Sequence, residues 1–248
     1  MRRGRVVAGA LVVGAVVVAL LLVPRLVRDT DAEPRSATPG QACTDPVLTT
    51  SSNRTWNDGG FVVDQDMWNN HGGTQTLRAC SYHSWSVTAT QPDTPDVNAY
   101  PNVHRDFDAP RLTTFSEISS RFAAVGPGEG TYNFAYDVWL NGVATKGSTE
   151  IMIWTDTHGP VPQVPEQGEY TSRGVKYTVY RGGRYIAFLG SNRSAGEVDL
   201  LTFFRYAVAR GWLRPDPTVG QIDYGVEIRS TGGRPLDFAV TDFALTAR

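Results

Sequence analysis

The chain has 248 residues, of which 41% are hydrophobic and 19% charged, and it contains 25 glycines, 15 prolines and two cysteines. This apolar content can fill a core and excludes an intrinsically disordered chain, while the many Gly, Pro and aromatic residues disfavour a helical bundle. All-β sandwiches of about 200–250 residues commonly form a single unit, so we expect one domain.

The N-terminus carries a candidate export segment. Three arginines within the first five residues precede an uninterrupted apolar run of 18 residues, Val6 to Val23. A run of this length fits either a cleaved signal peptide or a retained membrane anchor. We therefore expect residues 1–28 to be the signal peptide or anchor, residues 29–42 to be a flexible linker, and residues 43–248 to be a secreted or membrane-anchored domain.

The charge balance limits the partners of that domain. The whole chain has a net charge of −2, and residues 1–35 hold six arginines against three acidic residues, which leaves −5 for the remainder. Nucleic-acid affinity depends on basic side chains that contact phosphates. We expect no nucleic-acid partner, no membrane contact except through the N-terminal segment, and a monomer.

The two cysteines lie beyond the export segment, where an oxidising compartment would allow them to pair. The alternatives for Cys43 and Cys80 are two buried thiols or a redox pair. Because the sequence has no CxxC spacing and no neighbouring His or Cys ligands, we favour a structural disulfide, which would stabilise the fold by about 4 kcal/mol.

From Cys43 onward the chain consists of short runs rich in β-branched and aromatic residues, broken by Gly, Pro, Asn or Asp. This pattern predicts an all-β domain. The segment 199–211 is an exception, because its apolar residues have helical spacing, Asp199 can cap its start and Gly211 can end it. We expect this helix to pack on the back of a sheet. The predicted strands lie within residues 59–68, 79–90, 131–140, 149–156, 174–182, 184–190, 221–229 and 237–247.

Two neighbouring strands bring chemically useful side chains onto one face. Strand alternation places Glu150, Met152 and Trp154 on the same side of their strand. The connection 141–148 allows this strand to pair as a hairpin with the preceding one, which would bring Asp137 near Glu150.

A third strand, near the C-terminus, presents Asp223, Gly225, Glu227 and Arg229 opposite an apolar row. If it joins the same concave surface, two glutamates from distant strands flank a bound chain. A pair of carboxyl groups can cleave a glycosidic bond, one attacking the anomeric carbon or activating water and the other protonating the departing oxygen. The alternative is that these glutamates are ordinary solvated residues.

The segment TEIMIW at 149–154, preceded by YDVWL at 136–140 and followed by HGP at 158–160, resembles the nucleophile region of glycoside hydrolase family 12, the β-jelly-roll endoglucanases. The resemblance covers about 200 residues in the right order. It implies a two-sheet β-jelly-roll sandwich with a concave substrate cleft and one α-helix packed on the convex side. Four further segments carry it: FVVDQDMWNN at 61–70, AYPNV at 99–103, VDLLTFFRYAVARG at 198–211 and YGVEI at 224–228.

Position by position, the resemblance implies Glu150 as the nucleophile, Glu227 as the general acid/base, and Asp137 beside the nucleophile. The implied activity is that of a retaining endo-β-1,4-glucanase acting on β-glucan polysaccharide without a cofactor or metal. In such a mechanism the two carboxyl groups lie about 5–5.5 Å apart. Asp137 and Glu150 would then share a proton.

The resemblance also suggests substrate contacts. We expect Trp68 and Trp154 to stack on sugar rings, Met152 to line the floor of the cleft, and Pro160 to contact substrate. The other tryptophans are expected to pack in the core or the hairpin: Trp56, Trp85, Trp139 and Trp212.

Two positions depart from the family pattern. Arg229 stands where family members usually have an aromatic residue, and Asp223 stands where they often have glutamine. Both are expected on the substrate-facing side, where Arg229 would lower the pKa of Glu227 and Asp223 would raise it, unless the two pair with each other.

Two other functions stay open: a carbohydrate-binding module that has lost turnover, and a cell-surface domain with a protein partner. The sequence does not decide between cellulose, mixed-linkage glucan and xyloglucan. The four histidines lack metal-like spacing, so we assign no metal site.

Overall fold

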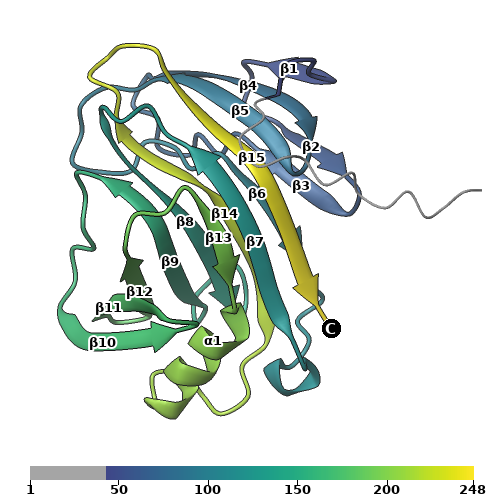
Figure 1. Ribbon diagram of the computed structural model, residues 1–248, viewed down its shortest axis with the longest axis vertical. Coiled ribbons are helices and arrows are strands. Elements are labelled where there is room, and N and C mark those ends of the chain that lie inside the picture. The colour runs from purple at the N-terminus through teal and green to yellow at the C-terminus, as the bar shows by residue number, and fades with distance from the viewer. Residues whose placement is uncertain (1–42) are drawn as a thin grey trace, which may run out of the picture. The chain divides into compact units, whose positions relative to one another are not determined.

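A computed structural model describes residues 43–248, so the predicted export segment and linker lie outside the described residues. Two β-sheets are layered face to face (Figure 1). The smaller sheet has the order β1 (Leu48–Thr50), β4 (Thr74–Ser81), β5 (Ser84–Thr90), β15 (Leu236–Ala247), β7 (Ile118–Val125), β13 (Ala195–Val198). The larger has the order β10 (Glu166–Ser172), β11 (Val175–Gly182), β12 (Tyr185–Gly190), β9 (Thr149–His158), β8 (Thr131–Leu140), β14 (Val219–Ser230), β6 (Asn102–Asp106), β3 (Phe61–Asp64), β2 (Thr55–Asp58).

This arrangement confirms the predicted all-β, two-sheet jelly-roll sandwich. Neighbouring strands are antiparallel except for β9 and β12, which pair in parallel. The predicted strand 79–90 is two strands, β4 and β5, joined by a turn at Tyr82 and His83. A short 3₁₀ helix, η1 (Leu112–Thr114), precedes β7. Within residues 43–248 no helix combines the length and apolar character that a membrane span requires.

The sheets enclose one apolar core because alternate residues of each strand point inward. Along β14 the inward row is Ile222, Tyr224, Val226 and Ile228, as the alternation predicts. The prediction of packing for three of the tryptophans is confirmed. Trp85 lies inside this core, and Trp56 and Trp212 pack partly buried against it.

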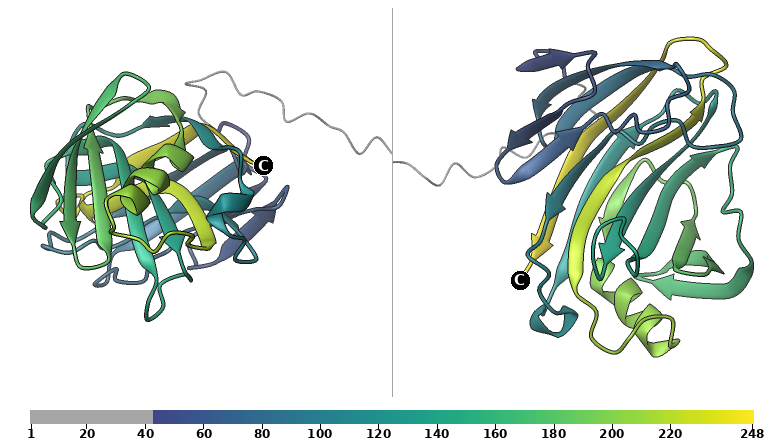
Figure 2. Two further views of the ribbon diagram at one scale, coloured as in Figure 1. Left: turned by 90° about the horizontal axis from the view of Figure 1, so that it is seen from below. Right: turned by 180° about the vertical axis from the view of Figure 1, so that it is seen from behind.

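The predicted helix is present as α1 (Leu200–Ala209), at the lower end of the sheets in Figure 1 and in the right-hand view of Figure 2. The Phe203 ring packs edge-on against Tyr177 and Phe188, with centroids 5.0 and 4.9 Å away. Phe188 pairs with the core residue Ile153, so the helix packs on the convex, core-facing side of the larger sheet, as expected.

The ends of α1 are only partly as predicted. Gly211 follows the last turn with a positive φ of 71°, which suits glycine. Asp199 occupies the N-cap position, but the predicted side-chain cap is wrong. The carboxylate of Asp199 lies 3.8 Å from Arg173 instead, and the backbone carbonyl of Asp199 accepts the hydrogen bonds from Thr202.

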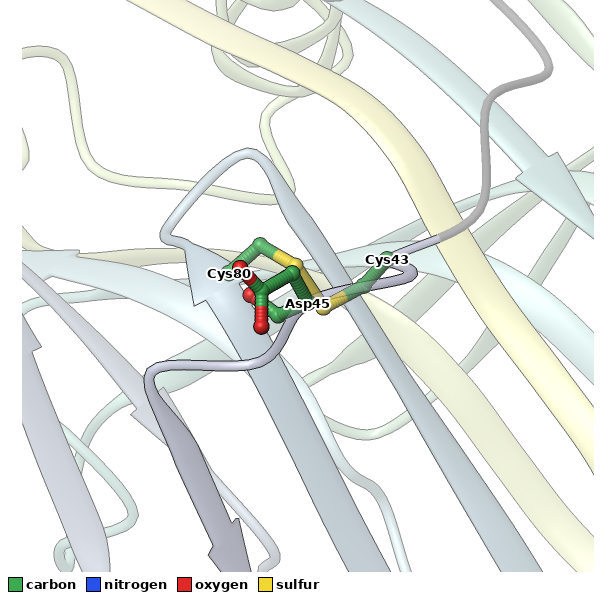
Figure 3. Close-up of a disulfide and its surroundings, with 3 residues drawn as sticks. All are labelled: Cys43, Asp45 and Cys80. Carbon is green, nitrogen blue, oxygen red and sulfur yellow. A yellow bond between two sulfur atoms is a disulfide. The ribbon is translucent and has the colours of Figure 1, made fainter.

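The predicted disulfide between Cys43 and Cys80 is confirmed, with Cα atoms 5.6 Å apart (Figure 3). Cys80 lies near the end of β4, where the pairing with β5 shifts register between Ala79 and Ser81. The bridge therefore fastens the first described residue to a strand of the smaller sheet.

Candidate active site

A cleft of about 970 Å³ lies on the face of the larger sheet that is turned away from the core. Side chains of β3, β6, β8, β9 and β14 contribute to it, together with residues from the connecting loops. Arg229 is the one arginine or lysine among the lining residues, so the cleft is strongly acidic. Its carboxyl groups belong to Asp64, Asp66, Asp96, Asp137, Glu150, Asp223 and Glu227.

The hairpin of β8 and β9 positions two of these carboxyl groups, Asp137 and Glu150. Trp139 pairs with Glu150 and Asp137 pairs with Met152, which makes Asp137 and Glu150 diagonal neighbours on one face. Burial and the charge of Glu227 raise the pKa of Glu150 to about 7. Burial and the charge of Glu150 raise the pKa of Asp137 well above its usual range. A neighbouring pair of this kind shares a proton near neutral pH, and the proton favours the more strongly shifted Asp137.

Glu227 enters the same cleft from β14. The side-chain amide of Asn133 on β8 donates a hydrogen bond of 2.7 Å to Glu227 Oε2. Burial raises the pKa of Glu227, while the Asn133 hydrogen bond and the Arg229 charge partly offset that rise. A raised pKa suits a carboxyl group that donates a proton near neutral pH. Glu227 and Glu150 line one cleft, and each lies within electrostatic range of Asp137.

Two tryptophans offer rings to the cleft. Trp68 lines it and is 65% exposed, consistent with the predicted stacking surface. Trp139 was expected to pack in the core or the hairpin; it lies in the β8–β9 hairpin, outside the apolar core, and lines the cleft. The reason is strand alternation, which puts Trp139 on the same face as Asp137.

Three predicted substrate contacts are not in the cleft lining. Trp154 is 1% exposed, so the prediction that it stacks on sugar is wrong. Met152 is buried below the Tyr185 hydroxyl, which donates a 3.3 Å hydrogen bond to its sulfur, and it does not form the cleft floor. Pro160 is also buried, and its carbonyl accepts a hydrogen bond from Thr157. Trp154 and Met152 pack instead in a second apolar cluster with Ala135, Ala187, Tyr180, Tyr185 and Leu189.

The two departures from the family pattern both line the cleft, but they do not pair with each other. Asp223 lies opposite Asp137 on one side and His104 on the other. Arg229 donates a hydrogen bond of 3.1 Å to the carbonyl of Pro95. The expected lowering of the Glu227 pKa by Arg229 is confirmed in direction.

Several cleft residues were missed in the sequence because they belong to β6 and the segment before it. The Tyr100 hydroxyl reaches across β14 and donates a 3.0 Å hydrogen bond to the Ala135 carbonyl of β8. A Cβ atom on Gly225 would lie 2.2 Å from the Pro101 carbonyl oxygen, so glycine there permits this close approach. Asn102 and His104 could have been found from alternation along β6, because both face the cleft.

No group of three or more His, Cys, Asp or Glu residues within 43–248 is arranged to hold a metal ion.

The family model "Glycosyl hydrolase family 12" matches residues 59–247. No curated protein matches the chain. Among solved structures, the chain is similar to the xyloglucanase domain of NopAA, a type three effector from Sinorhizobium fredii, solved with cellobiose. The two are 26% identical with a TM-score of 0.74, over 82% of this chain and 100% of that one.

Two further structures share the fold. One is a family 12 xyloglucanase from Bacillus licheniformis, 19% identical with a TM-score of 0.71, over 81% of this chain and 100% of that chain. The other is an endoglucanase from Rhodothermus marinus, 21% identical with a TM-score of 0.73, over 81% of this chain and 99% of that chain. Because the family model spans most of the domain that carries the acidic cleft, the chain belongs to glycosyl hydrolase family 12.

Proposed function

We propose that this glycoside hydrolase is a retaining endo-β-1,4-glucanase that is secreted or held outside the cell by its N-terminal segment. The observation that carries the proposal is the convergence of Glu150, Glu227 and Asp137, from three strands, in one acidic cleft. Family membership makes the hydrolysis of glycosidic bonds the starting point, and the arrangement of these carboxyl groups supports the finer assignment.

Each carboxyl group has a distinct role in the proposed double displacement. Glu150 attacks the anomeric carbon while Glu227 gives its proton to the departing glycosidic oxygen, so that a glycosyl ester forms on Glu150. Glu227 then takes a proton from water, the oxygen of that water bonds to the anomeric carbon, and Glu150 leaves as a carboxylate. Asp137, whose pKa is raised by burial and by Glu150, keeps its proton and donates a hydrogen bond to Glu150.

The proposed substrate is an uncharged β-1,4-linked glucan. An anionic polysaccharide would meet repulsion from the carboxyl groups that line the cleft. The rings of Trp68 and Trp139 offer apolar faces to sugar rings. The structural relatives include xyloglucanases as well as an endoglucanase, so xyloglucan belongs among the candidate substrates with cellulose and mixed-linkage glucan.

The test is hydrolysis of a panel of these three polysaccharides, with matched carboxyl-to-amide variants. We expect activity in the wild type, its loss in Glu150→Gln and in Glu227→Gln, and no change in Glu166→Gln, which alters an exposed glutamate outside the cleft. Glucan binding without hydrolysis would instead indicate a carbohydrate-binding module. The absence of both would favour a protein-binding domain.

A further inference from the structure

Asp223 lies at the centre of the cleft face, beside the proposed catalytic carboxyl groups. In the antiparallel register it stands directly opposite Asp137 of β8 and, on its other side, opposite His104 of β6. Directly opposed residues of an antiparallel pair have Cβ atoms about 4.5–5.5 Å apart. The carboxyl groups of Asp223 and Asp137 are therefore within reach of each other.

Both of these carboxyl groups are buried at the cleft wall. Asp223 is 4% exposed and Asp137 is 8% exposed. The Oδ1 atom of each is buried and has no hydrogen-bond partner among residues 43–248. Two adjacent carboxylates, both withdrawn from water, would repel strongly, and the hydrogen bond that Trp139 gives to Asp137 offsets this only in part. At least one of the two groups is therefore protonated.

The groups around Asp223 do not supply a compensating positive charge. Burial lowers the pKa of His104 despite the opposing charges of Asp106 and Asp64, so the imidazole does not act as a compensating cation at neutral pH, and its Nδ1 donates a hydrogen bond to Asn102 Oδ1. Arg229 turns to the Pro95 carbonyl and forms no ion pair with Asp223. Burial first, and then the carboxylates of Asp66, Asp106 and Asp64, raise the pKa of Asp223 well above its usual range. The charged and titratable groups at this part of the cleft are Asp64, Asp66, Tyr100, His104, Asp106, Asp137, Glu150, Tyr185, Glu227 and Arg229.

We propose that Asp223 is a positioning residue that stays protonated and donates a hydrogen bond to Asp137, which in turn donates to Glu150. In this arrangement three carboxyl groups hold two protons and one negative charge, and the charge rests on the oxygen that attacks the sugar. The inference rests on the proposed function of Glu150 and adds a residue that acts through Asp137 rather than on the substrate.

Two variants of Asp223 distinguish the effect of hydrogen-bond donation from the effect of negative charge. Asp223→Asn keeps an N–H donor and cannot ionise, so kcat should stay within about threefold of the wild type. Asp223→Ala removes the donor and leaves Asp137 with an unpaired buried oxygen, so kcat should fall roughly 10- to 100-fold while KM changes less than about threefold. Asp93→Asn, an exposed aspartate outside the cleft lining, is the matched control and should change neither quantity.

The pH profile gives a second readout, which distinguishes a neutral Asp223 from an ionised one. If Asp223 is neutral, Asp223→Asn removes no charge, and the acidic limb of kcat/KM stays in place. If Asp223 were ionised, its replacement would take away a negative charge and lower the pKa values of Asp137 and Glu150, so the acidic limb would move to lower pH. That shift, or wild-type kcat in Asp223→Ala, would overturn the proposal.

A measurement without activity keeps this inference separate from the proposed function. Carboxyl ¹³C NMR of the aspartate-labelled protein, with Asp223→Asn used for assignment, should show the Asp223 signal still protonated at neutral pH. A signal that titrates near the usual aspartate pKa of about 4 would refute the proposal even if Asp223→Ala did not fold. If the wild type hydrolyses no glucan, the proposed function fails, and the NMR titration still decides the protonation of Asp223.

Discussion

Removing the disulfide should lower stability without changing the cleft. The bridge joins residues 37 positions apart. In the chain-entropy model a closed loop of this length removes about 13 cal/mol/K from the unfolded state, or about 4 kcal/mol at 25 °C. For a domain of this size 1 kcal/mol corresponds to about 2–4 °C in Tm, so the Cys43→Ser, Cys80→Ser double variant should melt roughly 10 °C lower than the wild type.

The assay is thermal unfolding followed by circular dichroism, with reduced wild-type protein as a second route to the same state. Neither cysteine lines the cleft, so hydrolytic activity at 25 °C should be unchanged in the folded double variant. A change in Tm of less than about 2 °C would refute the loop-entropy reasoning. Lost activity in a still-folded variant would refute the separation of the bridge from the cleft.

Three further predictions concern the cleft. Gly225→Ala should destabilise the fold by about 3 kcal/mol in denaturant unfolding, because its Cβ would lie 2.2 Å from the Pro101 carbonyl oxygen; wild-type stability would contradict this. Asn133→Ala removes the donor that favours the Glu227 anion, so the pKa of Glu227 should rise and the alkaline limb of kcat/KM should move to higher pH; an unmoved limb would count against that hydrogen bond. Trp68→Ala should raise KM for polysaccharide roughly fivefold and leave Tm unchanged, since the ring is 65% exposed; an unaltered KM would remove Trp68 from the binding surface.

The strands that carry the proposed chemistry could be predicted from the sequence. Period-two alternation identified the faces of β8, β9 and β14, and the eight-residue connection indicated the hairpin that joins the first two. These patterns are local, and they place Asp137, Glu150 and Glu227 on the outward faces of their strands. That the three faces form one cleft depended on the family resemblance, because strand order within a sheet is a long-range property.

Burial within the cleft could not be predicted in the same way. Strand alternation correctly placed Trp154 and Glu150 on one face of β9. Trp154 is nevertheless buried in the second apolar cluster, whereas Glu150 lines the cleft. Trp154 belongs to an apolar cluster against which Leu189 of β12, its pairing partner, and Tyr180 of β11 pack, and β12 reaches β9 through a parallel pairing that no local pattern indicates. Trp139 shows the opposite result: it was expected to be packed, but it lies outside the second apolar cluster and lines the cleft.

The segment Tyr100–Asp106 was missed as a strand for a related reason. Asn102, His104 and Asp106 interrupt the apolar pattern that strand prediction relies on. Asn102 and His104 are nevertheless buried, because they face the polar cleft and hydrogen bond to each other. Polar residues at every second position, beginning with Asn102 inside the segment AYPNV, were the available signal.

The most direct test of the account is the anomeric form of the first product released from a soluble β-1,4-glucan oligosaccharide, followed by ¹H NMR before mutarotation. The β-anomer should form first with the wild type, and neither anomer should form with Glu150→Gln. If the α-anomer forms first, or if Glu150→Gln turns over like the wild type, Glu150 is not the nucleophile of a double displacement.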